Sequence, residues 1–347
     1  MTEDRISVGI IGLGRSGWNI HAAGIAQLDR YRVAAVADPM AERRAEAEAK
    51  FGCAAYTTPE ELINDGTVDL VVVATPSHTH VPLALEALSA GKHVLVEKPL
   101  AQSADEVDLM ITAAEKADRV LTCFHNRRFD PELLAIQDVI ASGRLGDLVL
   151  IRRALHRFAR RADWQTLRRL GGGELPNTAS HLLDQVLLFM DDGPVELFAD
   201  LRRTVSAGDA EDHVKLCLKT PTGPAVDLES SSVVATPQPD WLIAGTTGGL
   251  TSQANKLTVR WFDPAGLTEL ETDERVAVAG RQYGTGEQID WHEETIDLEP
   301  PSGERTVLYY RRLAETLQDG ADVFVTPQSV RRQIALMEQA RQQTGFY

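Results

Sequence analysis

The chain is short of cysteine, of basic residues and of long apolar runs, and each shortage excludes a class of protein. Three cysteines among 347 residues, Cys53, Cys123 and Cys217, are too few and too scattered for a disulfide framework or a zinc cluster. Lys and Arg together number 35 against 51 Asp and Glu, which gives a net charge of -16. We therefore expect no nucleic acid partner and no anionic membrane partner, because both require a basic surface.

No apolar run reaches the roughly 18 residues of a membrane span. The N-terminal stretch MTEDRISVGIIGLG carries acidic residues and leads directly into a strand-like run, which is unlike a secretory signal. Apolar residues make up 43% and charged residues 25% of the chain, as in ordinary globular proteins. Because domains average roughly 100–200 residues, the length predicts two domains in a soluble, cytoplasmic protein.

Residues 1–124 alternate strand-like and helix-like segments with short connections. The apolar, β-branched runs predict strands at Ile6–Ile11, Arg32–Ala37, Asp69–Ala74, His93–Val96 and Val120–Cys123. Helices are expected from the first strand to about Leu28, at Met40–Phe51, at Val81–Ala90, and from a capping box at Ser103 and Glu106 to Lys116. This alternation predicts an α/β domain with a doubly wound parallel sheet.

Residues 125–347 follow a different pattern, with several strands and few helices between them. Strands are expected at Asp147–Phe158, Glu196–Val205, His213–Leu218, Ala225–Val234, Trp241–Gly245 and Lys256–Trp261. Helices are expected at Pro131–Ser142, Thr178–Met190, Thr306–Gln318 and Pro327–Thr344. The pattern favours an α+β domain with a mainly antiparallel sheet, and the last helices are expected to pack back on the first domain.

A glycine-rich loop follows the first strand and opens the first helix. It reads Gly12-Leu13-Gly14-Arg15-Ser16-Gly17, and Asp38 stands 21 residues after Gly17 at the end of the next strand. In this context the pattern is the fingerprint of a dinucleotide site, where glycines let the pyrophosphate approach the helix N-terminus. The alternative is a glycine turn followed by an Asp that caps a helix.

Asp38 bears on the choice of cofactor. Its carboxylate can accept hydrogen bonds from both hydroxyls of the adenosine ribose, and it would repel a 2′-phosphate. The sequence therefore predicts NAD rather than NADP. Arg43 and Arg44 follow closely and weaken that preference, since either is able to reach a phosphate.

Three further stretches complete a family resemblance. They are Ala74-Thr75-Pro76-Ser77-His78-Thr79-His80, then Glu97-Lys98-Pro99, then Gly171-Gly172-Gly173 followed by Asn177, His181 and Asp184. With the glycine loop, their order and spacing resemble the Gfo/Idh/MocA oxidoreductases over nearly the whole chain. The resemblance implies an N-terminal Rossmann domain, a second domain with a large open sheet, and NAD(P)-dependent chemistry on sugars and cyclitols. It also implies a homodimer or homotetramer built through the open sheet.

The resemblance assigns further cofactor contacts outside the glycine loop. These are Thr75, Pro76, His80, Glu97, Lys98, Asn126 and Arg127. His78 and His80 flank one residue, but no third ligand is evident, so we expect no metal site.

Lys98 is the first candidate for catalysis. It follows the strand His93–Val96, at the carboxyl edge where open α/β sheets bind ligands. Burial and a nearby oxidised nicotinamide would both lower the pKa of this amine, which suits a base. In the family the bond to Pro99 is often cis. The alternative is a surface lysine before a turn-forming proline.

A second candidate stripe lies on the predicted helix Thr178–Met190. Asn177 and His181 are four residues apart and Asp184 follows three later, so the three share one helix face. We expect His181 to exchange a proton with the substrate hydroxyl, and Asp184 to orient its neighbours or bind a hydroxyl. A satisfied core histidine is the alternative. Many relatives have Asp in place of Asn177, so a His–Asp base pair is in doubt here.

Arginines cluster in an otherwise acidic chain, at Arg152, Arg153, Arg157, Arg160 and Arg161. They favour either an acidic substrate bound by Arg157 or a solvated strand edge paired with acids. Trp164 is expected either to stack on a sugar ring or to pack.

Taken with the resemblance, these residues favour an NAD(P)-dependent oxidoreductase. It would transfer a hydride between nicotinamide and a secondary hydroxyl of a sugar, cyclitol or sugar derivative. The alternative is a non-catalytic dinucleotide-binding regulator on the same fold, which the neutral Asn177 leaves open.

Overall fold

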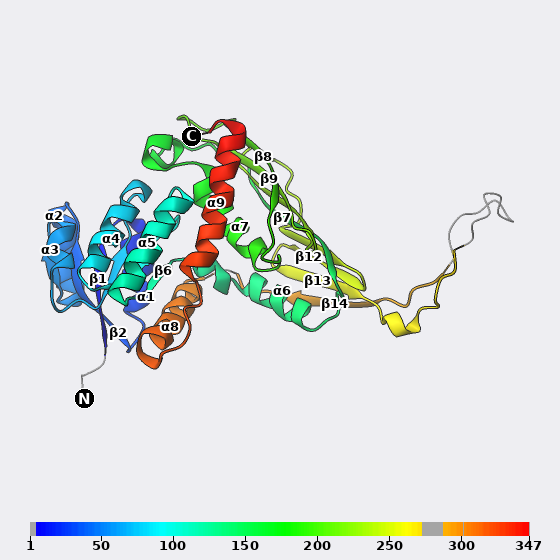
Figure 1. The fold of residues 1–347 in the computed structure, drawn as a ribbon, viewed down its shortest axis with the longest axis horizontal. Helices are drawn as coiled ribbons and strands as arrows, with labels where there is room; N and C mark the ends of the chain where they lie inside the picture. The colour runs from blue at the N-terminus through cyan, green and yellow to red at the C-terminus, as the bar shows by residue number, and fades with distance from the viewer. Residues whose placement is uncertain (1–4, 273–286, 301, 347) are drawn as a thin grey trace.

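The computed structural model describes residues 5–272, 287–300 and 302–346. Two sheets face each other across a helical layer (Figure 1). The first sheet is entirely parallel with the order β3-β2-β1-β4-β5-β6, the order of dinucleotide-binding Rossmann domains, so the predicted doubly wound sheet is confirmed. Its strands are β1 (Ile6–Ile11), β2 (Tyr31–Ala37), β3 (Ala54–Tyr56), β4 (Leu70–Val73), β5 (His93–Val96) and β6 (Leu121–Cys123).

The helices of this first region follow the predicted pattern with two differences. They are α1 (Ala23–Ile25), α2 (Ala41–Phe51), α3 (Pro59–Ile63), α4 (His80–Ser89) and α5 (Ala104–Ala117). The first helix begins as a π-helical turn, Gly17–Ala22, and ends at Ile25, earlier than expected. Strand β3 and helix α3 were not predicted, although Thr58 and Glu61 form a capping box that marks the start of α3.

The second sheet has the order β14-β13-β12-β11-β7-β10-β9-β8, and only β7 and β10 pair in parallel. The predicted, mainly antiparallel sheet is therefore confirmed. Two of its strands escaped prediction, since β12 starts with two glycines and β14 is an edge strand with mostly exposed side chains. The strands are β7 (Leu148–His156), β8 (Glu196–Arg202), β9 (His213–Lys219), β10 (Ala225–Ser231), β11 (Trp241–Gly245), β12 (Gly248–Gln253), β13 (Lys256–Trp261) and β14 (His292–Asp297).

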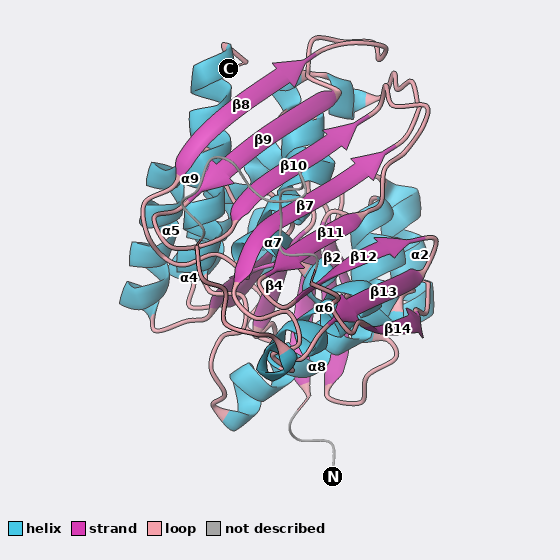
Figure 2. Ribbon diagram, turned by 90° about the vertical axis from the view of Figure 1, so that its right-hand side faces the viewer, coloured by secondary structure: helices cyan, strands magenta, loops and turns pink. Residues whose placement is uncertain are grey.

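Helices α7 and α9 pack on one face of this sheet, and Figure 2 looks onto the opposite face. The helices of this half are α6 (Pro131–Ala141), α7 (Ser180–Leu187), α8 (Glu304–Asp319) and α9 (Pro327–Thr344). On the open face, charged side chains form a ladder across β7, β10 and β9, where Arg152 lies 3.3 Å from Asp227.

The last two helices return to the first sheet, as expected. The Tyr309 hydroxyl donates a hydrogen bond of 2.7 Å to the Cys123 carbonyl, and Arg331 on α9 pairs with Asp108 on α5. The buried apolar side chains form one continuous cluster that includes both sheets. A division of the chain into residues 1–124 and 125–347 stays a prediction.

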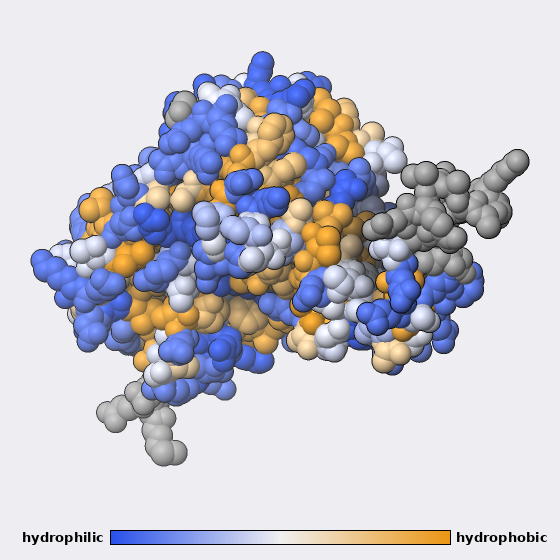
Figure 3. Space-filling model, turned by 45° about the vertical axis from the view of Figure 1, so that its right-hand side comes forward, coloured by the Kyte–Doolittle hydropathy of each residue, from blue (hydrophilic) through white to orange (hydrophobic). Residues whose placement is uncertain are grey.

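On the face shown in Figure 3, apolar residues are interspersed with polar ones. Within the three described ranges, no helix is both long enough and apolar enough to cross a membrane.

Candidate functional site

The glycine loop joins β1 to the first helical turn and leaves room for a ligand beside one of its glycines. Gly12 has a φ of +91°, and a Cβ there would lie 2.8 Å from the Ala74 carbonyl oxygen. A Cβ on Gly17 would lie 1.9 Å from the Gly12 oxygen, so helix and strand pack closely only without a side chain. A Cβ on Gly14 would meet nothing within 4 Å. The loop therefore fits a dinucleotide pyrophosphate at Gly14.

Asp38 follows β2 and is buried against this loop. One carboxylate oxygen accepts a 2.8 Å hydrogen bond from the Leu13 amide, and the other accepts one of 2.9 Å from the Met40 amide. The Arg43 guanidinium lies 3.3 Å away. Asp38 thus ties the end of β2 to the glycine loop, at the place where the sequence predicted the ribose contact.

Glu97 faces the glycine loop from the end of β5. The Ser16 hydroxyl donates a hydrogen bond to its carboxylate, and Nε2 of His21 lies 3.3 Å from it. Although burial raises the pKa of Glu97, these two partners and the Lys98 charge lower it to about 2. The other ring nitrogen of His21 bonds to the Tyr310 hydroxyl at 2.7 Å, so α8 supports the loop.

Lys98 points toward the second half of the chain. Its Nζ donates hydrogen bonds to the backbone oxygen of Asn177 at 2.7 Å and to the side-chain Oδ1 of Asn177 at 3.3 Å. Burial lowers the pKa of Lys98 to about 8; Glu97 acts in the opposite direction and Arg127 adds to the lowering. The Lys98–Pro99 bond is cis, as the resemblance implied. Because its Nζ is bonded to Asn177 inside the protein, Lys98 is not the surface lysine of the alternative.

His80 connects the loop after β4 with the Lys98–Pro99 turn. Its ring nitrogens lie 2.8 Å from the Pro99 oxygen and 3.0 Å from the Thr75 oxygen, and the ring is buried. Pro76 precedes the single helical turn that leads into α4. With both nitrogens engaged, His80 positions this edge of the sheet. In the part of the chain that the structure describes, no group of three metal-ligand side chains occurs.

His181 lies in the first turn of α7, which continues from a π-helical turn at Leu175–Ala179. Its Nδ1 is buried and has no hydrogen-bond partner among the described residues, so it is not a satisfied core histidine. Burial, together with the positive charges of Lys98 and Arg127, lowers the pKa of His181 well below its usual value. The ring is therefore neutral, and its Nδ1 is available to form a hydrogen bond with a ligand.

Asp184, one turn further along α7, is held within the protein. Arg128 donates two hydrogen bonds to its carboxylate, at 2.9 and 2.7 Å, and Nδ1 of His125 lies 3.7 Å away. The His125 ring packs edge-on against the ring of His181, with 6.0 Å between centroids. These contacts make a buried link from Asp184 through His125 to His181.

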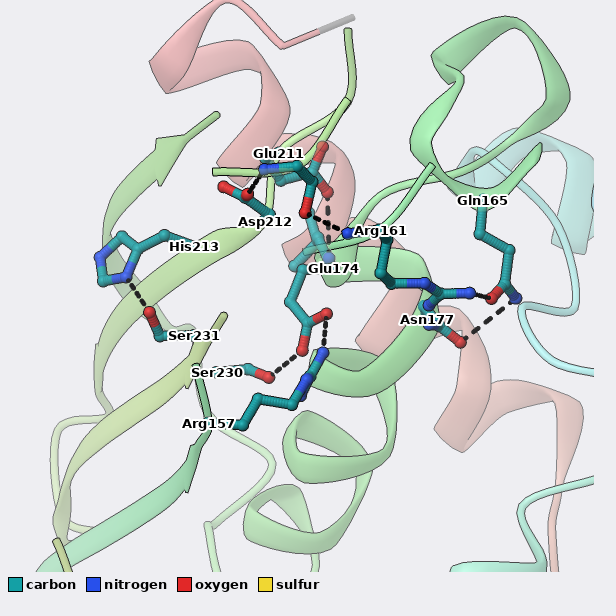
Figure 4. Close-up of polar contacts among 12 residues, drawn as sticks. Arg157, Arg161, Gln165, Glu174, Asn177, Glu211, Asp212, His213, Ser230 and Ser231 are labelled. Atoms are coloured by element: carbon teal, nitrogen blue, oxygen red, sulfur yellow. Dashed lines mark hydrogen bonds and ion pairs between the residues drawn. The ribbon is translucent and has the colours of Figure 1, made fainter. Parts of the chain in front are cut away.

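Arg152, Arg157 and Arg161 of the cluster pair with acids, but β7 is a central strand of the sheet rather than the solvated edge that was the alternative. Arg157 donates to Glu174 at 2.6 Å (Figure 4), and Arg161 lies 2.8 Å from Asp163. Trp164 is 44% exposed and begins a short helical turn at Trp164–Thr166.

The remaining predicted cofactor residues lie in the loops after β1, β4 and β6. Asn126 is buried at the start of the turn that follows β6. The Arg127 and Arg15 charges both lower the pKa of Lys98, and the Arg127 guanidinium has no hydrogen bond or ion pair within the described residues. Thr75 bonds its hydroxyl to that of Thr79 at 2.6 Å.

Two residues near Lys98 and His181 went unnoticed in the sequence. Gln165 reaches Asn177 from the short turn after Asp163, and His125 stands beside His181. Gln165 has no periodic or motif signal. His125 stands two residues after the end of β6, just as Lys98 stands two residues after the end of β5, and that position could have revealed it.

Comparisons with known proteins agree with this geometry. Residues 6–125 match the model of an oxidoreductase family with an NAD-binding Rossmann fold, and residues 133–251 match the GFO/IDH/MocA C-terminal domain. The chain is 29% identical over 97% of its length, and 93% of the relative's, to the NADP⁺ scyllo-inositol 2-dehydrogenase IolW of Bacillus subtilis. It is 34% identical to a myo-inositol 2-dehydrogenase of Thermotoga maritima, over 56% of this chain and 57% of the relative.

The fold also matches solved structures. An oxidoreductase of Agrobacterium radiobacter, solved with NAD⁺, L-tartaric acid and magnesium, superposes with a TM-score of 0.80 at 20% identity, over 98% of this chain and 96% of that one. Because the two family models together cover more than half of the chain, and the glycine loop has the room that a dinucleotide needs, the chain belongs to the Gfo/Idh/MocA family of NAD(P)-dependent oxidoreductases.

Proposed function

We propose that this enzyme is a dehydrogenase of a cyclitol or a closely related sugar, with Lys98 as the base. The observation that carries the proposal is the buried Lys98 amine, bonded to Asn177 and having a pKa of about 8. At pH 7 roughly a tenth of amines with that pKa is neutral and able to accept a proton, far more than for an exposed lysine. Two relatives named as inositol 2-dehydrogenases support the substrate class.

The roles of the side chains follow from their positions. When bound, an oxidised nicotinamide supplies the acceptor for a hydride from the carbinol carbon. Lys98 accepts the hydroxyl proton at Nζ. The neutral His181 ring lies beside this amine and binds a hydroxyl of the substrate through its unpartnered Nδ1, which holds the hydroxyl near Lys98. Arg127 faces the same space with an unpaired guanidinium and orients the substrate or the nicotinamide.

Asp184 and Arg157 act through their neighbours in this proposal. The carboxylate of Asp184 is occupied by Arg128, and its charge lies 3.7 Å from Nδ1 of His125, whose ring packs against His181. Arg157 is paired with Glu174, and its guanidinium is therefore not available as a free anion site. Both residues are positioning residues rather than substrate contacts. Exposed Trp164 offers an aromatic face for a sugar ring.

NAD is the proposed cofactor, on the strength of the Asp38 carboxylate at the end of β2. The B. subtilis relative is named for NADP⁺, so family membership alone does not decide between the two.

We further propose a homodimer or homotetramer in which the open face of the eight-stranded sheet is the contact. That face carries exposed Phe198 beside the charged ladder of Arg152, Lys215 and Asp227. Light scattering after size exclusion measures the assembly. A monomer at micromolar concentration contradicts this proposal and leaves the chemistry untouched.

The experiment for the function is a panel of inositol stereoisomers and aldoses, each offered with NAD⁺ and with NADP⁺. Formation of the reduced nicotinamide is followed by its near-ultraviolet absorbance. We expect turnover of at least one inositol with NAD⁺. Dinucleotide binding without turnover of any member of the panel would overturn the cyclitol assignment.

A further inference from the structure

A line of polar side chains leads from the surface to Lys98. Asp163 accepts two hydrogen bonds of 3.0 Å from Arg161, whose guanidinium also donates to Oε1 of Gln165. Nε2 of Gln165 then lies 3.5 Å from Oδ1 of Asn177, which also accepts from Lys98. We call these four side chains before Lys98 the amide relay, and Figure 4 shows its Arg161, Gln165 and Asn177 members.

The direction of each amide in the relay is fixed by its neighbours. A guanidinium has only N–H donors, so the atom of Gln165 that faces Arg161 must be its oxygen. An ammonium also has only donors, so the atom of Asn177 that faces Lys98 must be its oxygen. The side-chain NH2 group of Gln165 then donates to the same Oδ1 atom of Asn177. Nδ2 of Asn177 consequently points elsewhere and has no hydrogen-bond partner among the described residues.

Gln165 is itself held in place by the backbone. Its backbone N–H donates a 2.9 Å hydrogen bond to the side chain of Asp163, which caps the turn Trp164–Thr166. Its carbonyl oxygen accepts one of 2.9 Å from the amide of Gly173, in the glycine stretch that precedes Asn177. The stretch and the relay are therefore one connected unit.

We propose that Gln165 is a positioning residue that orients the amide of Asn177, so that Oδ1 serves Lys98 and Nδ2 is presented to a substrate hydroxyl. A carboxylate at position 177 has two equivalent oxygens and needs no such orientation. An asparagine has two different ends, and only one of them suits a neighbouring ammonium. Gln165 thus fixes the orientation of the side-chain amide, which a neutral asparagine needs and a carboxylate does not. The inference rests on the proposed role of Lys98 as the base.

Several charged groups act on the Lys98 amine in addition to its hydrogen bonds with Asn177. Burial is the largest influence, and the ionisable groups that face it are Glu97, Arg127, Cys123 and Arg15, with His181 nearby on α7. Glu97 is the carboxylate among them, and it is also engaged by Ser16 and His21. The hydrogen bonds that favour the ammonium form come from Asn177, through its backbone oxygen and its Oδ1.

The test is a double-mutant cycle on the pKa of Lys98, measured in the full-length chain without any substrate. The chain has seven lysines, so competitive acetylation across a pH series, followed by peptide mass spectrometry, resolves Lys98. We expect Gln165→Met to lower the pKa of Lys98 by about one unit, because the freed Asn177 amide no longer holds its oxygen toward the ammonium.

The second arm of the cycle replaces Asn177 with aspartate, whose two carboxylate oxygens are equivalent. Asn177→Asp should raise the pKa of Lys98 by about one unit or more, because a carboxylate then lies beside the amine. In that background Gln165→Met should no longer lower it. Gln238→Met is the matched control, since Gln238 pairs with Arg152 at 2.9 Å on the open face of the sheet and should leave Lys98 unchanged.

An equal downward shift in both backgrounds, or none in either, overturns the proposal and assigns Gln165 a packing role. Gln165→Glu separates the two roles again, because it keeps the shape but offers only oxygens to Asn177. On the substrate found in the panel it should reduce kcat at least as much as Gln165→Met does, with little change in KM. Normal kcat in Gln165→Glu contradicts the orienting role. The acetylation result stands whether or not a cyclitol is the substrate.

Discussion

Glu97 and Lys98 are consecutive in the chain, yet their charged groups serve different halves of the molecule. The Glu97 carboxylate bonds to Ser16 in the glycine loop, and the Lys98 ammonium bonds to Asn177 in the turn before α7. The pKa of Glu97 falls to about 2 because its partners outweigh burial, whereas burial itself lowers the pKa of Lys98 to about 8. This dipeptide is where the residues assigned to the cofactor meet those assigned to the substrate.

The glycine loop makes a prediction with a built-in control. Gly17→Ala should destabilise the fold, because its Cβ would lie 1.9 Å from the Gly12 oxygen. Gly14→Ala should unfold at the wild-type temperature, since nothing lies within 4 Å of its Cβ, but should lose NAD affinity because the methyl group occupies the pyrophosphate position. Thermal unfolding and titration calorimetry measure the two effects. Unchanged affinity in Gly14→Ala would mean that the dinucleotide binds elsewhere.

Asp38 should set the choice between the two dinucleotides. Asp38→Asn keeps an oxygen for the Leu13 amide, but it removes the charge that repels a 2′-phosphate and frees Arg43. We expect the ratio of NADP affinity to NAD affinity to rise about tenfold or more, as loss of one charge contact near a surface allows. Calorimetric titration with both dinucleotides gives the ratio. Glu42→Gln, an exposed neighbour on α2, is the control and should leave the ratio unchanged.

Glu211 should make stability fall with rising pH. Burial raises its pKa to about 7, although the Leu175 amide donates to it at 3.0 Å. The folded chain keeps this proton between about pH 4.5 and 7 while the unfolded chain releases it, so the free energy of unfolding decreases as pH rises through that window. The full effect is about 3 kcal/mol.

Glu211→Gln removes this titration while keeping an acceptor for Leu175. Urea unfolding across pH should show the variant equal to wild type near pH 4 and more stable, by up to about 3 kcal/mol, at pH 8. Glu46→Gln, at an exposed position on α2, should show no pH-dependent difference from wild type. A constant difference between Glu211→Gln and wild type at all pH values would argue that Glu211 is already ionised when folded.

Strong local patterns made much of the fold predictable. Buried β1 and β4 are continuous apolar runs, and the capping box at Ser103 marks the start of α5 as expected. The short β3 and the exposed edge strand β14 lack such patterns, because three residues show no period and an edge strand need not alternate. The early end of the helix after the glycine loop was not predicted, because nothing in its sequence marks Ile25 as a boundary.

The sequence predicted only those residues of the site that belong to a recognisable motif. The tripeptide at Lys98 and the spacing of Asn177 and His181 identified residues that the fold brings together. The pairing of Asp184 with Arg128 and of Arg157 with Glu174 was hidden, because each pair joins segments whose meeting depends on tertiary packing. Gln165 shows the same limit most clearly, since a single amide has no signature until its partners are placed.

The most direct test of the central claim is the pH dependence of kcat/KM for oxidation of the substrate that the panel identifies, in wild type and in Lys98→Met. The neutral amine is the base, so wild-type kcat/KM should rise with pH and level off above the pKa of about 8. Lys98→Met should lose about 10²–10⁴-fold in kcat/KM and lose that pH limb, while still binding NAD. Lys116→Met, at an exposed position on α5, should behave as wild type. A Lys98→Met variant that keeps both the rate and the limb at about pH 8 would contradict the account.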